Sequence, residues 1–137
     1  MGNKYGNRKC SYDGMTFDSK RERDRYCELK LLQMAGKISD LRCQVRYDLV
    51  PEQREPDKIG PRGGFRRGKL LEKPVYYVAD FVYKVPVQSV ATDEEGLLTF
   101  HDGWKTVVED AKGHRTRDYI IKRKLMLWVH GIRIKEV

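Results

Sequence analysis

Two segments rich in aromatic and β-branched residues constrain the fold of this chain most, and each carries acidic residues within an apolar run. Residues 75–83, VYYVADFVY, and residues 104–113, WKTVVEDAKG, have the composition of β-strands on a largely buried surface. Because strand side chains alternate between two faces, Asp80 shares a face with Val78 and Val82. A carboxylate among apolar neighbours costs free energy unless another group compensates its charge.

The second of these strands places an acid and an amine on one face. Asp110 and Lys112 are two residues apart and project together, whereas Glu109 points the other way. Hydrolysis of a phosphodiester needs a hard divalent cation, and such ions prefer the oxygen ligands that Asp80 and Asp110 can supply. A neighbouring lysine can orient the attacking water and stabilise charge on the phosphate. The alternative is that both aspartates merely end strands and that Lys112 forms an ordinary ion pair.

A helix precedes these strands. Residues 19–35 begin with a capping box, Ser-Lys-Arg-Glu, continue with good helix formers and stop before a glycine. Glu22 follows a row with Tyr26 and Leu29 on the inward face, so its carboxylate can approach the sheet. A capping box also uses this glutamate to bind the backbone amide of Ser19, which is a second role for the same side chain.

Charge and length indicate a single domain with an anionic partner. The 137 residues suit one domain, and 28 basic against 20 acidic residues give a net charge of +8, which favours nucleic acid. No apolar run reaches the length of a membrane span and no secretory signal is evident, so we expect an intracellular, cytoplasmic protein. The spacing of Cys10, Cys27 and Cys43 favours neither a disulfide framework nor a zinc site.

Residues 52–73 are too long and too poor in apolar residues for a routine connection, and we predict a flexible basic loop. Glycines and one aromatic residue interrupt its cations, so the loop can follow phosphates while Phe65 stacks on a base or wedges into a branch. The phosphate-cradling P-loop pattern is absent. The cations concerned are Arg62, Arg66, Arg67 and Lys69.

Further candidates for nucleic-acid contact lie on predicted regular elements. Residues 41–49 alternate apolar and polar residues as a half-exposed strand does, and its polar face carries Gln44 and Arg46. A helix over residues 117–130 is also predicted, with basic residues beside an apolar stripe. For both elements a merely solvated polar face is the alternative. The remaining basic candidates are Arg115, Lys122, Arg123 and Lys124.

The other expectations concern connections and packing. An acidic turn and a short strand over residues 97–101 predict a hairpin between the two acidic strands, and residues 132–137 predict a final strand. The stripe expected to bury the second helix leaves Tyr119 on another side. It consists of Ile120, Ile121, Leu125, Trp128 and Val129.

The order of these elements resembles the PD-(D/E)XK nuclease superfamily over residues 17–137. Asp80 is similar to its first acid and Asp110-Ala111-Lys112 to its D-x-K element, although no proline precedes Asp80. More narrowly, the Ser-Lys-x-Glu, Tyr-x-x-Asp-Phe and Glu-Asp-x-Lys-Gly motifs resemble a family of small phage-encoded domains akin to Holliday-junction resolvases. The resemblance implies an α/β restriction-endonuclease-like core, a mixed β-sheet flanked by helices.

The resemblance also implies a site and a reaction. Asp80, Asp110, the backbone carbonyl of Ala111 and an acid on the first helix, here Glu22, would hold Mg²⁺ or Mn²⁺, with Lys112 as the catalytic amine. The implied protein is a homodimer that cuts branched DNA in phage recombination or replication, inside a bacterial host cell. A monomeric nicking or flap-cutting enzyme and a basic nucleic-acid-binding module without catalysis are the alternatives.

Overall fold

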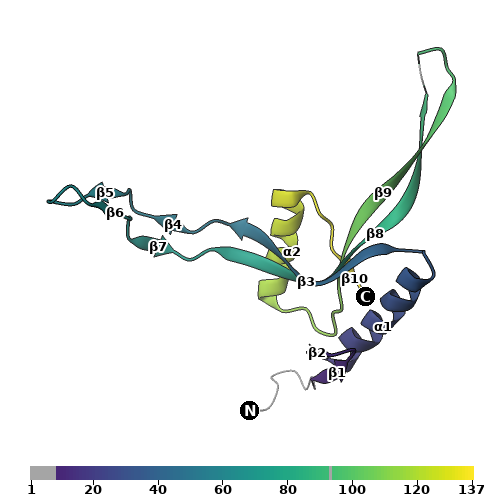
Figure 1. Cartoon of the computed structure of the whole chain (residues 1–137), viewed down its shortest axis with the longest axis horizontal. Helices are drawn as coiled ribbons and strands as arrows, with labels where there is room; N and C mark the ends of the chain where they lie inside the picture. Colours follow the sequence, from purple (N-terminus) through teal and green to yellow (C-terminus); the bar gives the residue numbers. More distant parts are fainter. Residues whose placement is uncertain (1–8, 93) are drawn as a thin grey trace.

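The protein has a mixed four-stranded β-sheet with two helices packed on it, in a computed structural model that describes residues 9–92 and 94–137 (Figure 1). The strand order is β10-β9-β8-β3, in which β8 is antiparallel to both β3 and β9, and β10 is parallel to β9. The predicted α/β class with a mixed sheet and flanking helices is confirmed. The strands are β3 (Ser39–Val50), β8 (Val75–Thr92), β9 (Leu98–Asp110) and β10 (Lys135–Glu136).

Both predicted helices form with the expected caps. The Ser19 hydroxyl accepts the Glu22 backbone amide at 3.1 Å to begin α1 (Lys20–Met34), and Thr116 caps α2 (Arg117–His130) in the same way. Neither helix is long and apolar enough to cross a membrane. Before α1, β1 (Cys10–Tyr12) and β2 (Met15–Phe17) form a small hairpin, while residues 1–8 of the expected N-terminal arm lie outside the described residues.

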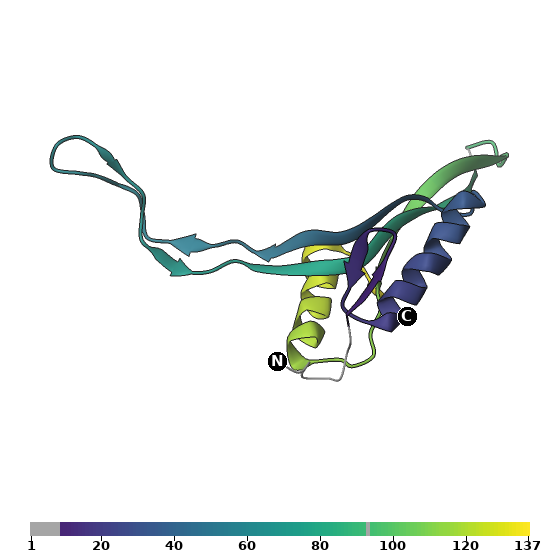
Figure 2. The same cartoon turned by 60° about the horizontal axis from the view of Figure 1, so that its bottom comes forward.

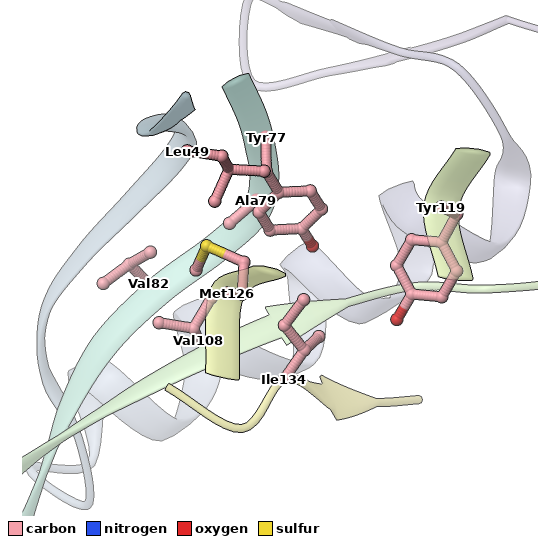
Figure 3. Packing of buried hydrophobic residues seen from close by; sticks show 8 residues of the cluster. All are labelled: Leu49, Tyr77, Ala79, Val82, Val108, Tyr119, Met126 and Ile134. Atoms are coloured by element: carbon pink, nitrogen blue, oxygen red, sulfur yellow. The ribbon is translucent and has the colours of Figure 1, made fainter. Parts of the chain in front are cut away.

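Each helix packs on its own hydrophobic cluster. Tyr119 and Met126 of α2 pack with Val108 of β9, and Figure 3 shows Tyr119 and Tyr77 near each other beside this group. Tyr26 and Leu29 of α1 belong to a second cluster. The α2 cluster consists of Leu49, Tyr77, Ala79, Val82, Val108, Tyr119, Met126 and Ile134, and the α1 cluster of Phe17, Tyr26, Leu29, Ile38, Phe81 and Tyr83.

The strand that carries Asp80 changes clusters at that residue. Odd-numbered side chains of β8 up to Ala79 pack in the α2 cluster, whereas from Phe81 onward they pack in the α1 cluster. Between the pairs Cys43–Phe81 and Val45–Ala79, the ladder leaves Asp80 and the opposing residue without a register partner. That opposing residue, Gln44, has a φ of 54°. Local irregularities of this kind re-aim side chains, and functional sites are where they concentrate.

The segment predicted as a basic loop contains short paired strands and forms a two-stranded arm. The chain continues from β3 into β4 (Gln53–Arg54) and β5 (Lys58–Ile59), and it returns through β6 (Phe65–Arg66) and β7 (Leu70–Glu72) to β8. Figures 1 and 2 show this arm extending far from the sheet. Strand pairing satisfies the backbone without a core, which is why poor apolar content did not prevent it. We call residues 51–74 the arm.

The connection between the acidic strands is also simpler than predicted. β8 and β9 pair continuously from Phe81–Glu109 to Thr92–Leu98, so the expected short strand over residues 97–101 is part of β9. Figure 1 shows this second hairpin projecting away from the arm. Asp80 and Asp110 therefore lie on neighbouring strands, as predicted, but these two strands form one hairpin with no further strand between them.

The packing face of α2 was predicted wrongly. Tyr119 and Met126 are buried, whereas Ile121 and Trp128 of the predicted stripe are 56% and 86% exposed. The physical reason is that Tyr119 hydrogen-bonds Glu136 through its hydroxyl, so the polar end of a large aromatic ring is satisfied inside. Ile120 and Leu125 do pack partly against the cluster, and the final strand shortens to Lys135–Glu136.

Candidate active site

Four predicted site residues converge at one end of the sheet, each from a different segment. Glu22 comes from α1, Asp80 from β8, Asp110 from the last position of β9, and Lys112 from the loop that follows. One side-chain amide connects two of them: Gln44 Nε2 donates to Glu22 Oε1 at 2.9 Å and to Asp80 Oδ1 at 3.4 Å. We call Glu22, Asp80 and Asp110 the acidic cluster.

Asp80 lies at the centre of this cluster. Its Oδ2 accepts the Ala111 backbone amide at 2.9 Å, which fixes the carboxylate against the end of the neighbouring strand. Burial and the charges of Asp110 and Glu22 raise the pKa of Asp80 to about 8. The sequence argument that this carboxylate needs compensation therefore describes its actual surroundings.

Asp110 is the most deeply buried of the three acids, at 1% exposure. The Tyr77 hydroxyl donates to its Oδ2, and the Lys112 ammonium lies 3.2 Å from its Oδ1. That ammonium does not meet hydrogen-bond geometry, so Asp110 Oδ1 is buried with no hydrogen-bond donor. A buried carboxylate oxygen that accepts no hydrogen bond is costly, and beside the Lys112 ammonium it keeps lone pairs that can ligate a cation.

Glu22 is buried at 5% exposure, and its side chain turns toward the sheet. Burial and the Asp18 carboxylate, followed by Asp110, raise the pKa of Glu22. Only one half of the capping box is seen here, because Ser19 accepts the Glu22 amide while the Glu22 carboxylate accepts from Gln44. The geometry therefore favours a role in the cluster.

Glu109 has a separate, structural role, as its predicted opposite orientation implies. It is fully buried, and Arg25 of α1 pairs with it through Nε at 2.5 Å and Nη2 at 3.0 Å. The Tyr83 hydroxyl also donates to Glu109 Oε2 at 2.5 Å. Both oxygens of this carboxylate therefore accept hydrogen bonds, whereas only Oδ2 of Asp110 does.

The donor chemistry of the cluster fits a hard divalent cation. It offers carboxylate oxygens and the Ala111 backbone, and Asp110 Oδ1 lacks a donor. Within residues 9–92 and 94–137, however, no three His, Cys, Asp or Glu side chains stand close enough together to form a preformed metal site. Gln44 occupies oxygens of both Glu22 and Asp80, and it must release them before a metal can take them.

The basic residues predicted to contact nucleic acid fall into different environments. Arg115 and Arg123 both pair with Glu136, at 2.5 Å and 3.0 Å. Lys122 instead lies 5.9 Å from the centroid of the Tyr76 ring, and Lys124 lines a separate cavity with Arg123. Sequence reasoning treated these cations as equivalent, and only their partners distinguish them.

The arm likewise contains two kinds of cation. Arg54 and Arg67 pair with Glu52 at 2.9 Å and 2.6 Å, so they stabilise the arm's base. Near the end of the arm, Ile59 and Phe65 are cross-strand partners that are 80% and 74% exposed. Lys58, Arg62 and Arg66 make no ion pair among the described residues, and we call them the tip cations. Lys69 lies between these groups, its carbonyl accepting the Glu55 amide at 2.9 Å.

Sequence reasoning missed two contributors to the site. Gln44 was expected on a solvent-facing surface, but its amide lies between two carboxylates. Tyr77 was expected on the face away from Asp80, yet its hydroxyl binds Asp110. Regular alternation predicted both wrongly because the face changes at Gln44 and Asp80, and no local signal marks that change. The expectation that Gln44 contacts DNA stays a prediction.

Comparison with known proteins identifies a family. A family model described as "Protein of unknown function (DUF1064)" matches residues 2–132, nearly the whole chain, and the protein therefore belongs to this family. No curated protein and no solved structure matches the chain significantly.

Proposed function

We propose that this member of the DUF1064 family is a metal-dependent endonuclease that hydrolyses phosphodiester bonds in DNA. The observation that carries the proposal is the acidic cluster: Glu22, Asp80 and Asp110 approach each other from three elements, and one buried oxygen of Asp110 accepts no hydrogen bond and has only the Lys112 ammonium beside it. Burial, with the charges of Asp110 and Glu22, raises the pKa of Asp80, and burial with the charges of Asp18 and Asp110 raises the pKa of Glu22. Such clusters raise the free energy of the fold and are found where function requires them.

Each residue of the site would have a distinct role in this reaction. A divalent cation held by Asp80, Asp110, the Ala111 carbonyl and Glu22 would neutralise charge that develops on the scissile phosphate. Tyr77 orients Asp110, and the Ala111 amide orients Asp80, so both carboxylates are fixed before substrate arrives. Lys112, whose ammonium lies 4.3 Å from the Tyr119 ring centroid, presents a cation for the phosphate and the attacking water.

The substrate we propose is branched DNA. The net charge of +8 suits a polyanion, and the tip cations with Phe65 stand at the end of an arm that continues the strands carrying Gln44 and Asp80. The resemblance to phage-encoded Holliday-junction-resolvase-like enzymes adds a role in recombination or replication, a homodimer, and an intracellular site of action in the bacterial host.

The experiment is cleavage of labelled junction, flap, duplex and single-stranded DNA in the presence of Mg²⁺, Mn²⁺ or EDTA. We expect metal-dependent cutting, its loss in Asp80→Asn and Asp110→Asn with DNA affinity retained, and a strong loss in Lys112→Ala. Asp24→Asn, an exposed α1 carboxylate, is the matched control and should cut normally. Normal turnover in either cluster variant would remove the site assignment.

One observation favours a second candidate, a DNA-binding module without catalysis. Gln44 hydrogen-bonds two of the three acids, which is an arrangement that can satisfy carboxylates without a metal. This candidate predicts DNA binding with no turnover on any substrate or with any metal, and unchanged binding in Asp80→Asn. The same set of assays separates the two functions.

A further inference from the structure

A cleft opens beside Lys112. Its cavity of about 260 Å³ is lined by strand residues of β8 and by the first turns of α2. Lys112 and Tyr77, which both contact Asp110, line it as well, so the cleft is continuous with the candidate active site. The full lining is Tyr76, Tyr77, Val78, Lys112, Thr116, Asp118, Tyr119 and Lys122.

Tyr76, an aromatic residue of this cleft, lies beside two cations. Tyr76 is 41% exposed, although it lies on a central strand. The Arg46 guanidinium lies 4.0 Å from its ring centroid and the Lys122 ammonium 5.9 Å. Exposed rings beside cations are the combination with which proteins bind single strands, because the ring stacks on a base while the cation meets a phosphate.

The charges lining the cleft favour an anion. Lys112, Lys122 and one carboxylate, Asp118, line the cleft, and the Lys112 ammonium pairs with Asp110 at 3.2 Å, so Lys122 is the cation that remains for an anion. Lys122 forms no ion pair among the described residues, whereas Arg123, its neighbour in sequence, pairs with Glu136. A cation without a partner in an open cleft keeps its full capacity to bind a phosphate.

We propose that this cleft binds the nucleotide next to the scissile phosphate, with its base stacked on Tyr76 and its phosphate held by Lys122. The proposal rests on the proposed nuclease function, since it places the DNA strand across Lys112. It also gives Arg46 a role: its guanidinium, which pairs with Asp48 at 3.0 Å, supports the Tyr76 ring from the neighbouring strand β3.

The test measures binding of a fluorescein-labelled partial-duplex DNA by anisotropy in EDTA, over a range of salt concentrations. Tyr76→Ala should weaken binding about tenfold, the loss expected for one base–aromatic stack, while Tyr76→Phe stays within about twofold. Lys122→Ala should lower the salt dependence by about 0.7–0.9 units, as one lost phosphate contact does. Lys37→Ala makes the same charge change at an exposed lysine outside the cleft lining, and it should retain the wild-type slope.

Several results would overturn the proposal. Equal losses in Lys122→Ala and Lys37→Ala would make the effect one of general charge, and undiminished affinity in Tyr76→Ala would exclude stacking. If the wild-type protein binds and cuts DNA while the cleft variants behave as wild type, the cleft assignment alone fails. If the wild-type protein does not bind DNA at all, the proposed function fails with it. Thermal melting of each variant, expected to match wild type, excludes unfolding as the cause.

Discussion

Replacing Asp80 by asparagine should stabilise the metal-free protein at high pH, because it removes the charge at the centre of the acidic cluster. The pKa of Asp80 is about 8 in the folded protein, against an ordinary value of 3.8. At pH values between 3.8 and about 8, Asp80 therefore keeps its proton in the folded protein and loses it in the unfolded chain. The free energy of unfolding of the wild-type protein is therefore undiminished by Asp80 below about pH 4, and it declines as the pH rises toward 8.

The magnitude follows from this interval. One proton changes the free energy of unfolding by about 1.4 kcal/mol per pH unit, so an interval of about four units sets a ceiling of roughly 6 kcal/mol. Water reaches part of Asp80, which reduces the effect, and we expect Asp80→Asn to exceed wild type by about 2 kcal/mol at pH 8. For a chain of this length that is a rise of roughly 6 °C in Tm.

The assay is thermal or urea unfolding of both proteins in EDTA at several pH values from 4 to 8. The difference between the two curves cancels other titrating groups and should grow with pH. Asp24→Asn, whose carboxylate is 54% exposed, is the control and should follow wild type throughout. A variant no more stable than wild type at pH 8, or a difference that does not change with pH, would refute the interpretation of an uncompensated acidic cluster.

Three other predictions follow from the same contacts. Glu22→Gln should reduce metal-dependent cleavage at least tenfold but leave α1 intact, because the Glu22 backbone amide makes the helix cap. Initial rates measured across Mg²⁺ concentrations test this, and full activity would contradict a ligand role. Arg25→Ala should destabilise the fold by about 3–5 kcal/mol in urea melts, because it leaves the fully buried Glu109 unpaired, and a loss below about 1 kcal/mol would contradict this. Alanine at the tip cations should flatten the salt dependence of DNA binding by about 0.9 units per lost contact and leave the Tm unchanged. Arg67→Ala, which removes the pair with Glu52, should instead lower the Tm and leave the salt dependence nearer to that of wild type. Unchanged affinity in the tip variant would leave the arm without a DNA-binding role.

Local signals in the sequence determined the elements and most of the acidic site. The capping box and the threonine N-cap predicted both helices, because capping depends on residues a few positions apart. Strand alternation placed Asp110 with Lys112 and turned Glu109 away, which the buried pair with Arg25 bears out. These features depend on backbone geometry within one segment, and a sequence records that directly.

The tertiary structure alone decided which side chains meet. Gln44 and Tyr77 join the site because two paired strands change faces at one position, and that irregularity depends on how both helices pack rather than on any local pattern. The arm forms because its strands continue the ladder of β3 and β8, although its composition resembles a loop. Likewise, Glu136 pairs with Arg115 and Arg123 and leaves Lys122 to the cleft, a distinction that depends on contacts between residues distant in sequence.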